Sequence, residues 1–262
     1  MNLAFENPLD PMGWLIFVVA GIGTGVINTL AGSGSLVTLP IFMYVCGLPA
    51  SVANGTNRVG VFLQSLVGVA GFKKAGNLPT EGLVWILVPS ALGATLGSLI
   101  AVDLNEEIMH YAIGGLMVFM LGVLLLNPKR WIRESTFDPA KVKHPLTIGL
   151  MFLIGIYGGF LQAGVGIMLL AGLVLRAGFN LASANAVKLL AVIAFCIPAL
   201  LTFWYNGQVN WLLGFLMAIF QSIGAVIGVR FVSRVPNADQ WIHRLLIVVV
   251  AAAALKQFGV FG

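Results

Sequence analysis

Long apolar segments alternate with short polar connections along nearly the whole chain. Residues 83–102, 108–126 and 245–255 with their flanks are examples of these segments. A bilayer core about 30 Å thick needs about 20 apolar residues for each helical span. The pattern therefore predicts an all-α fold, a polytopic integral membrane helical bundle. Composition agrees, because 59% of the residues are hydrophobic and 9% are charged, against about 25% charged in a typical soluble domain.

The sequence also contains an internal repeat. At a constant offset of 131 residues, four residues of the first half recur in the second, namely Gly47, Ala53, Asn54 and Gly76 as Gly178, Ala184, Asn185 and Gly207. Slightly upstream, Gly32 and Gly34 match Gly164 and Gly166 at an offset of 132. We therefore expect an N-terminal repeat over residues 1–127 and a C-terminal repeat over residues 145–262. The linker over residues 128–144 is basic and is expected to be cytoplasmic.

Charges in the connections predict that the two repeats are inverted relative to one another. In the first half, Lys73 and Lys74 precede one apolar segment, and the acidic residue Asp103 follows it. The equivalent connections of the second half exchange character, since Arg234 occupies the position that matches Asp103. Because basic connections favour the cytoplasmic side, the repeats should run in opposite directions across the membrane.

Inversion requires an odd number of crossings in each half, which predicts a broken first hairpin in both. Residues 12–46 and 145–176 each form one long apolar run, interrupted near Gly34 in the first half and near Gly166 in the second. We interpret each run as a glycine-broken or re-entrant hairpin of two segments. This gives five segments per half, with both ends of the chain outside. Broken helices at matching places of inverted halves are typical of a transporter's binding site.

Two basic residues are predicted near the membrane midplane. Arg58 lies roughly 13 Å along a helix that starts near Pro49, and Lys188 lies roughly 15 Å along its partner, which starts near Gly178. A cation at that depth is costly unless it has a partner or faces a cavity. All nine acidic residues fall at segment ends or in connections, so no buried carboxylate is expected to neutralise either cation.

A bound anion would supply the missing negative charge. Helices that start near the two glycine breaks would present free backbone N–H groups to it. The predicted substrate-binding residues are Arg58, Lys188, Asn57, Thr56, Asn54, Asn185, Ser33, Gly34, Ser35, Gly164 and Gly166. The alternative is structural: each cation reaches the membrane surface or binds backbone carbonyl groups.

Other function classes have little support in the sequence. The Ser/His/acid and Cys/His combinations of enzymes are absent, as are HExxH and phosphate-loop signatures, so an enzyme is not expected. Cys46 and Cys196 lack the spacing of metal ligands, and we predict no metal and no cofactor. The net charge of +5 comes mostly from short connections, which argues against nucleic-acid binding. The Gly-xxx-Gly pairs are expected to be ordinary helix contacts.

These residues resemble the TauE/SafE family of sulfite exporters and related anion permeases. The similarity covers nearly the whole chain and rests on five short stretches, which are Gly32-Ser33-Gly34 with Leu39-Pro40, Gly47-Leu48-Pro49, Ala53-Asn54-Gly55-Thr56-Asn57, Ala184-Asn185-Ala186-Val187-Lys188 and Gly207-Gln208-Val209-Asn210-Trp211. The first glycine cluster has fewer glycines than is common in the family, and Val187 replaces the usual Thr or Ser. The resemblance implies an exporter of sulfite, an organosulfonate or another small sulfur-containing anion in the bacterial inner membrane.

Several alternatives stay open at this point. The chain could be a permease for another small anion or a metal ion, or a membrane subunit that transports nothing. The expected partners are a small anionic substrate and the lipid bilayer, with a homodimer as a further possibility.

Overall fold

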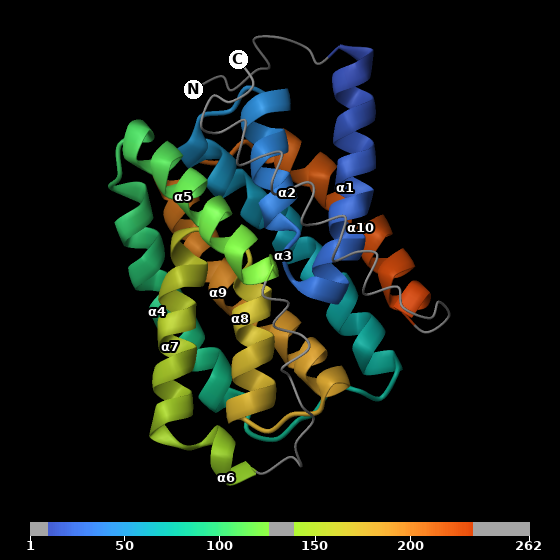
Figure 1. Cartoon of the computed structure of the whole chain (residues 1–262), viewed down its shortest axis with the longest axis vertical. Helices are drawn as coiled ribbons and strands as arrows, with labels where there is room; N and C mark the ends of the chain where they lie inside the picture. The colour runs from blue at the N-terminus through green and yellow to red at the C-terminus, as the bar shows by residue number, and fades with distance from the viewer. Residues whose placement is uncertain (1–9, 126–138, 233–262) are drawn as a thin grey trace.

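The computed structural model describes residues 10–125 and 139–232, and every regular element in these ranges is helical (Figure 1). The predicted all-α class is therefore confirmed. The elements of the first half are α1 (Pro11–Ala31), α2 (Ser35–Pro40), the π-helix η1 (Ile41–Val45), α3 (Ala50–Lys74), α4 (Val84–Val102) and α5 (Glu106–Leu125). After the short α6 (Pro139–Val142) come α7 (Pro145–Phe160), α8 (Val165–Ala171), the π-helix η3 (Gly172–Arg176), α9 (Leu181–Tyr205) and α10 (Trp211–Val232).

Within the described residues, five helices are long and apolar enough to cross a membrane. They are α1, α4, α5, α9 and α10. Large apolar side chains on these helices face outward, for example Leu92, Phe119 and Ile219, each more than half exposed. Such an apolar exterior is what the hydrocarbon interior of a bilayer requires, and the protein is a multi-pass membrane protein. Helix α3 has the necessary length but is not among the five, since polar residues interrupt its apolar sequence.

Both long N-terminal runs of the halves are broken hairpins, as predicted. Helix α1 ends at Gly32, whose φ of 71° lies in the left-handed region that favours glycine. The chain then re-enters a helix at Ser35 and continues through η1 to Val45. In the second half, Gly164 with a φ of 74° separates α7 from α8 and η3. At 1.5 Å per residue each short arm is roughly 16–18 Å long, about half the thickness of the bilayer core.

The 131-residue offset found in the sequence is repeated in the backbone. Gly47 and Gly178 end the two short arms with φ values of 66° and 77°. Gly76 and Gly207 end α3 and α9 with φ values of 71° and 69°. Equivalent positions of the two halves thus have equivalent conformations.

Packing between the halves is reciprocal. Helix α1 packs against α10 and α7 packs against α4, while α3 contacts α10 and α9 contacts α4. Exchanging α1 with α7, α3 with α9 and α4 with α10 converts each of these pairs into another. In Figure 1, α1 begins at the top of the molecule, whereas α7 begins at the bottom beside α6. The inverted arrangement stays a prediction, and the expected fifth segment of the second half and most of the linker lie outside the described residues.

Glycines allow the closest of these helix contacts. A Cβ atom on Gly93 or Gly97 of α4 would collide with backbone atoms of α7, and one on Gly155 or Gly159 would collide with α4. Gly25 and Gly224 have the same role between α1 and α10. The Gly-xxx-Gly pairs are therefore helix contacts, as predicted.

Candidate anion site between the two helix breaks

The two helix breaks meet inside the bundle. The backbone N–H of Gly166 donates a hydrogen bond of 3.2 Å to the carbonyl oxygen of Gly32. A Cβ atom on Gly32 would lie only 2.6 Å from the Cα of Gly166. Only glycine permits this approach, so the glycines identified in the sequence bring the two halves into direct backbone contact.

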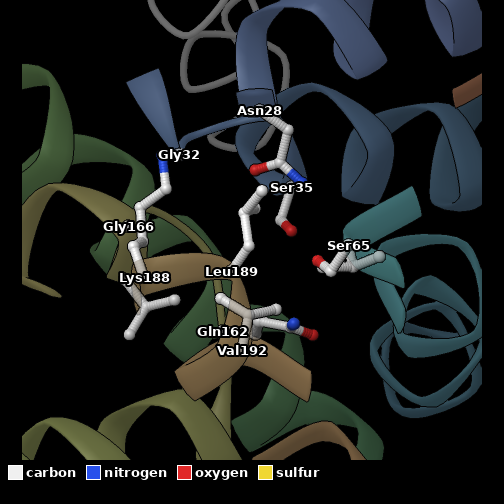
Figure 2. Close-up of a pocket in the computed structure, with 11 residues that line it drawn as sticks. Asn28, Gly32, Ser35, Ser65, Gln162, Gly166, Lys188, Leu189 and Val192 are labelled. Atoms are coloured by element: carbon white, nitrogen blue, oxygen red, sulfur yellow. The ribbon is translucent and has the colours of Figure 1, made fainter. Parts of the chain in front are cut away.

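A small cavity lies beside this contact (Figure 2). Its volume is about 10 Å³, which is room for about one water molecule. Its polar side chains come from five different parts of the chain and are those of Asn28 on α1, Ser35 on α2, Ser65 on α3, Gln162 between α7 and α8, and Lys188 on α9. Val61, Val165, Leu189 and Val192 line the rest. The cavity is enclosed by both breaks and both central helices, α3 and α9.

Lys188 is the cation of this cavity, and only 1% of its surface is exposed. Its Nζ donates to Asn185 Oδ1 at 2.9 Å and to the carbonyl oxygen of Thr29 at 3.4 Å. Thr29 lies in the last turn of α1, where the helix carries a partial negative charge. The ammonium group is therefore held by neutral or partly negative groups beside an open space.

Arg58 on α3 is fully buried, and its side chain reaches the C-terminal end of the other broken helix, α7. Its Nη1 donates to the carbonyl oxygen of Gly158 at 3.0 Å, and its Nη2 donates to those of Gly159 and Phe160 at 2.6 Å and 3.2 Å. The guanidinium carbon also lies 4.6 Å from the centre of the Phe203 ring, a cation–π distance. Arg58 thus binds the backbone carbonyl groups of the last turn of α7.

The two cations occupy related but different environments. Each binds the C-terminal turn of the broken helix of the other half, and each contacts the matching asparagine, Asn54 for Arg58 and Asn185 for Lys188. Every aspartate and glutamate in the described ranges is exposed, so carboxylates do not neutralise either cation. Helix C-termini provide partial negative charge instead, as in the structural alternative. Lys188 lines the cavity, whereas Arg58 is not one of its lining residues.

Four of the other predicted residues make hydrogen bonds inside the bundle. Asn57 Nδ2 donates to Ser35 Oγ at 3.0 Å, and Thr56 Oγ1 accepts from the N–H of Asn210 at 2.8 Å. Asn54 Nδ2 donates to the carbonyl oxygen of Phe160 at 2.8 Å. Among these four, Ser35 lines the cavity itself.

Ser33, Gly34 and Gly164 form the turns around the two breaks. Ser33 is completely buried, and Gly164 is the N-cap of α8. The N–H groups of Gly34 and Gly166, which we expected to be free for an anion, are occupied by Asn28 Oδ1 and the carbonyl of Gly32. In this conformation the N–H groups at the start of the two short arms therefore make hydrogen bonds within the protein.

Three cavity residues were not predicted from the sequence, namely Asn28, Ser65 and Gln162. Asn28 donates from Nδ2 to Gln64 Oε1 at 3.0 Å, which ties α1 to α3. Each is a polar residue inside or next to an apolar segment, and this pattern could have identified it as a candidate site residue. Gln162 also stands two residues before the glycine that opens the second break.

Comparison with known proteins agrees with this architecture. Residues 17–257 match the family described as "Sulfite exporter TauE/SafE". The chain belongs to the TauE/SafE family. It is 30% identical over 256 residues to "Probable membrane transporter protein YfcA" of Escherichia coli strain K12, covering 96% of this chain and 90% of that protein. It is 27% identical over 241 residues to "Probable membrane transporter protein ORF9" of Sinorhizobium sp., covering 92% and 90% of the two chains.

Membership of the TauE/SafE family confirms the predicted class of function. Both relatives carry the name of a membrane transporter, and the match covers the two halves and the linker. This TauE/SafE protein is a membrane transporter and a multi-pass protein of the bacterial inner membrane.

Proposed function

We propose that this TauE/SafE protein exports a small sulfur-containing anion, such as sulfite or an organosulfonate, by alternating access around the Lys188 cavity. The observation that carries the proposal is the position of Lys188. It is a buried cation that lines a cavity beside the contact between the two helix breaks. The family description supplies the class of anion.

The cavity offers hydrogen-bond donors as well as charge. Ser35 Oγ accepts a hydrogen bond from Asn57, so its own O–H can be donated elsewhere. Ser65 contributes a second hydroxyl, and the Lys188 ammonium group is a donor with a full positive charge. Charge-assisted hydrogen bonds of this kind are the stronger class, which suits an oxyanion with several acceptor atoms.

The size of the cavity supports alternating access. Room for about one water molecule is too little for a sulfur oxyanion, so the substrate needs a larger space. Gly32 and Gly166 both line the cavity, and the contact between them joins the two proposed inverted repeats. Separating these glycines would enlarge the cavity. The present conformation then corresponds to a closed state between the two open ones.

Sulfite binding and flux test the proposal. Lys188→Met should remove one charge-assisted contact, worth about 1.5–3 kcal/mol, and should weaken sulfite binding about 10- to 150-fold. Lys74→Met is the matched control, because Lys74 is exposed at the end of α3. It should leave affinity unchanged. Wild-type affinity in Lys188→Met would place the site elsewhere.

Proteoliposomes that contain only this protein separate the remaining alternatives. Sulfite or sulfonate flux supports the proposal, and flux of another small anion would change only the substrate. Within residues 10–125 and 139–232 there is no group of three His, Cys, Asp or Glu side chains that could hold a metal ion. The buried charge is also basic, so a metal ion is the weaker candidate. Failure to move any ion would support a subunit without transport activity.

A further inference from the structure

Two polar groups of the cavity have no hydrogen-bond partner in the described part of the chain. Gln162 is 2% exposed and Ser65 is completely buried. Gln162 Nε2 donates to Cys196 Sγ at 3.0 Å, but Gln162 Oε1 accepts nothing, and Ser65 Oγ is likewise unpaired. Leaving a buried polar atom unpaired is costly, which makes such atoms candidates for ligand contacts. One of the two, Gln162 Oε1, can only accept.

The backbone at Gln162 adds a second observation. Its φ is 61°, and it is the one non-glycine residue of the described ranges with a positive φ. The neighbouring turn is held by the Tyr157 hydroxyl, which donates to the carbonyl oxygen of Ala163. Backbone strain of this kind persists where the surrounding structure enforces it and is concentrated at functional sites. Here the strained residue carries the amide that lines the cavity.

An unpaired acceptor beside a cation selects among anions. The oxygen of a fully deprotonated oxyanion has only lone pairs to present to Gln162 Oε1, and the two oxygens would repel. An anion that keeps one hydroxyl group can donate its hydrogen to Gln162 Oε1 while its charged oxygens accept from Lys188 and Ser65. The carbonyl oxygens of α7 already hold Arg58. One positive charge, that of Lys188, therefore faces the cavity, and it matches one negative charge.

From these contacts, and resting on the function proposed above, we propose that the site binds a singly charged oxyanion that keeps one hydroxyl group. Hydrogen sulfite is the smallest sulfur example. Gln162 Oε1 accepts the hydrogen bond of that hydroxyl, and Lys188 and Ser65 donate to the other oxygens. The proton crosses the membrane bound to the anion, so one proton accompanies each negative charge. A carboxylate relay is not needed, in keeping with the exposed position of every described acidic residue.

The pH dependence of binding tests this proposal with purified full-length protein. The probes are sulfite, which changes from a monoanion to a dianion as pH rises, and methanesulfonate, which has one charge and no hydroxyl at every pH used. Sulfite affinity should fall about tenfold for each pH unit above the pKa of hydrogen sulfite. Methanesulfonate affinity should stay constant. Lys188 on α9 lines the cavity, Cys196 on α9 contacts Gln162, and Tyr157 on α7 holds the neighbouring turn. Arg58 on α3 interacts with Cys196. Titration of any of these groups would alter the binding of both probes together.

Two variants separate the acceptor from the donors. Gln162→Met removes the acceptor and keeps an unbranched side chain at the strained position. It should weaken hydrogen sulfite binding roughly 5- to 150-fold, because the buried hydroxyl loses its acceptor. It should not weaken methanesulfonate binding, because that anion has no hydroxyl to donate. Ser65→Ala removes a donor and should weaken the binding of both probes by a similar factor.

Three results would overturn the proposal in distinguishable ways. Tighter sulfite binding as pH rises would show that the dianion is preferred, and the monoanion proposal would fail while the transport proposal stands. Equal loss for both probes in Gln162→Met would assign Gln162 a structural role and have the same consequence. If wild-type protein binds neither probe at any pH, the proposed substrate class fails, and this inference fails with it.

Discussion

Arg58 should stabilise the fold rather than bind the anion, and replacing it by methionine tests this distinction. The substitution removes the donors for the carbonyl oxygens of Gly158 and Gly159 of α7, whereas that of Phe160 keeps the Asn54 amide as a donor. Each buried acceptor left unpaired costs about 1–3 kcal/mol. The two unpaired carbonyls together cost about 2–6 kcal/mol, and removing the buried charge recovers part of its desolvation cost, so we expect a net loss of about 1–4 kcal/mol. At roughly 2–4 °C per kcal/mol, the Tm should fall by about 2–16 °C.

The assay is thermal unfolding in detergent, with and without saturating sulfite. Arg58→Met should unfold early in both conditions and keep the stabilisation that sulfite gives the wild type. The Tm of Arg58→Lys should lie between those of Arg58→Met and the wild type, because a point charge replaces the planar group that spans three carbonyls. Lys188→Met should show the opposite response to sulfite, with the loss of the stabilisation that sulfite gives the wild type. If Arg58→Met keeps the wild-type Tm and loses the response to sulfite, our division of roles between the two cations is wrong.

Two further predictions follow from packing and topology. Gly97→Ala should lower the Tm, because its Cβ would collide with the backbone of α7 and overpacking costs about 1–3 kcal/mol, whereas Gly115→Ala, which has open space on α5, should not. Single cysteines at Asn77 and Gln208, in a cysteine-free background, should react with an impermeant thiol reagent from opposite sides of the membrane. Labelling of both from one side would contradict the inverted arrangement.

Local features of the fold could be read from the sequence. The positions of the helices follow from apolar segments of bilayer length, and the breaks follow from glycines such as Gly32 and Gly164 that take left-handed conformations. The repeat offset was visible because glycine is hard to replace at Gly47 and Gly178, where φ is positive. Each of these properties depends on a residue and its near neighbours.

The candidate site was only partly predictable, because its decisive contacts join distant residues. Depth along a helix placed Arg58 and Lys188 near the midplane, but it could not show that carbonyls 100 residues away hold Arg58. For the same reason it could not be predicted that, of the two cations, Lys188 lines the cavity and Arg58 does not. Gln162 was missed because its amide becomes important only through the strained turn at which it lies.

The polar character of α3 has a consequence for how the chain is assembled during synthesis. The insertion machinery selects helices by hydrophobicity, and an arginine near the centre of a span costs about 2.5–3.5 kcal/mol on the scale that describes this step. The carbonyl groups that hold Arg58 belong to residues 100–102 positions later in the chain. At about 5–20 residues per second, they are made roughly 5–20 seconds after Arg58 itself. During that interval α3 depends on its earlier neighbours or on a chaperone, and it gains the contacts that hold Arg58 only when α7 has been made.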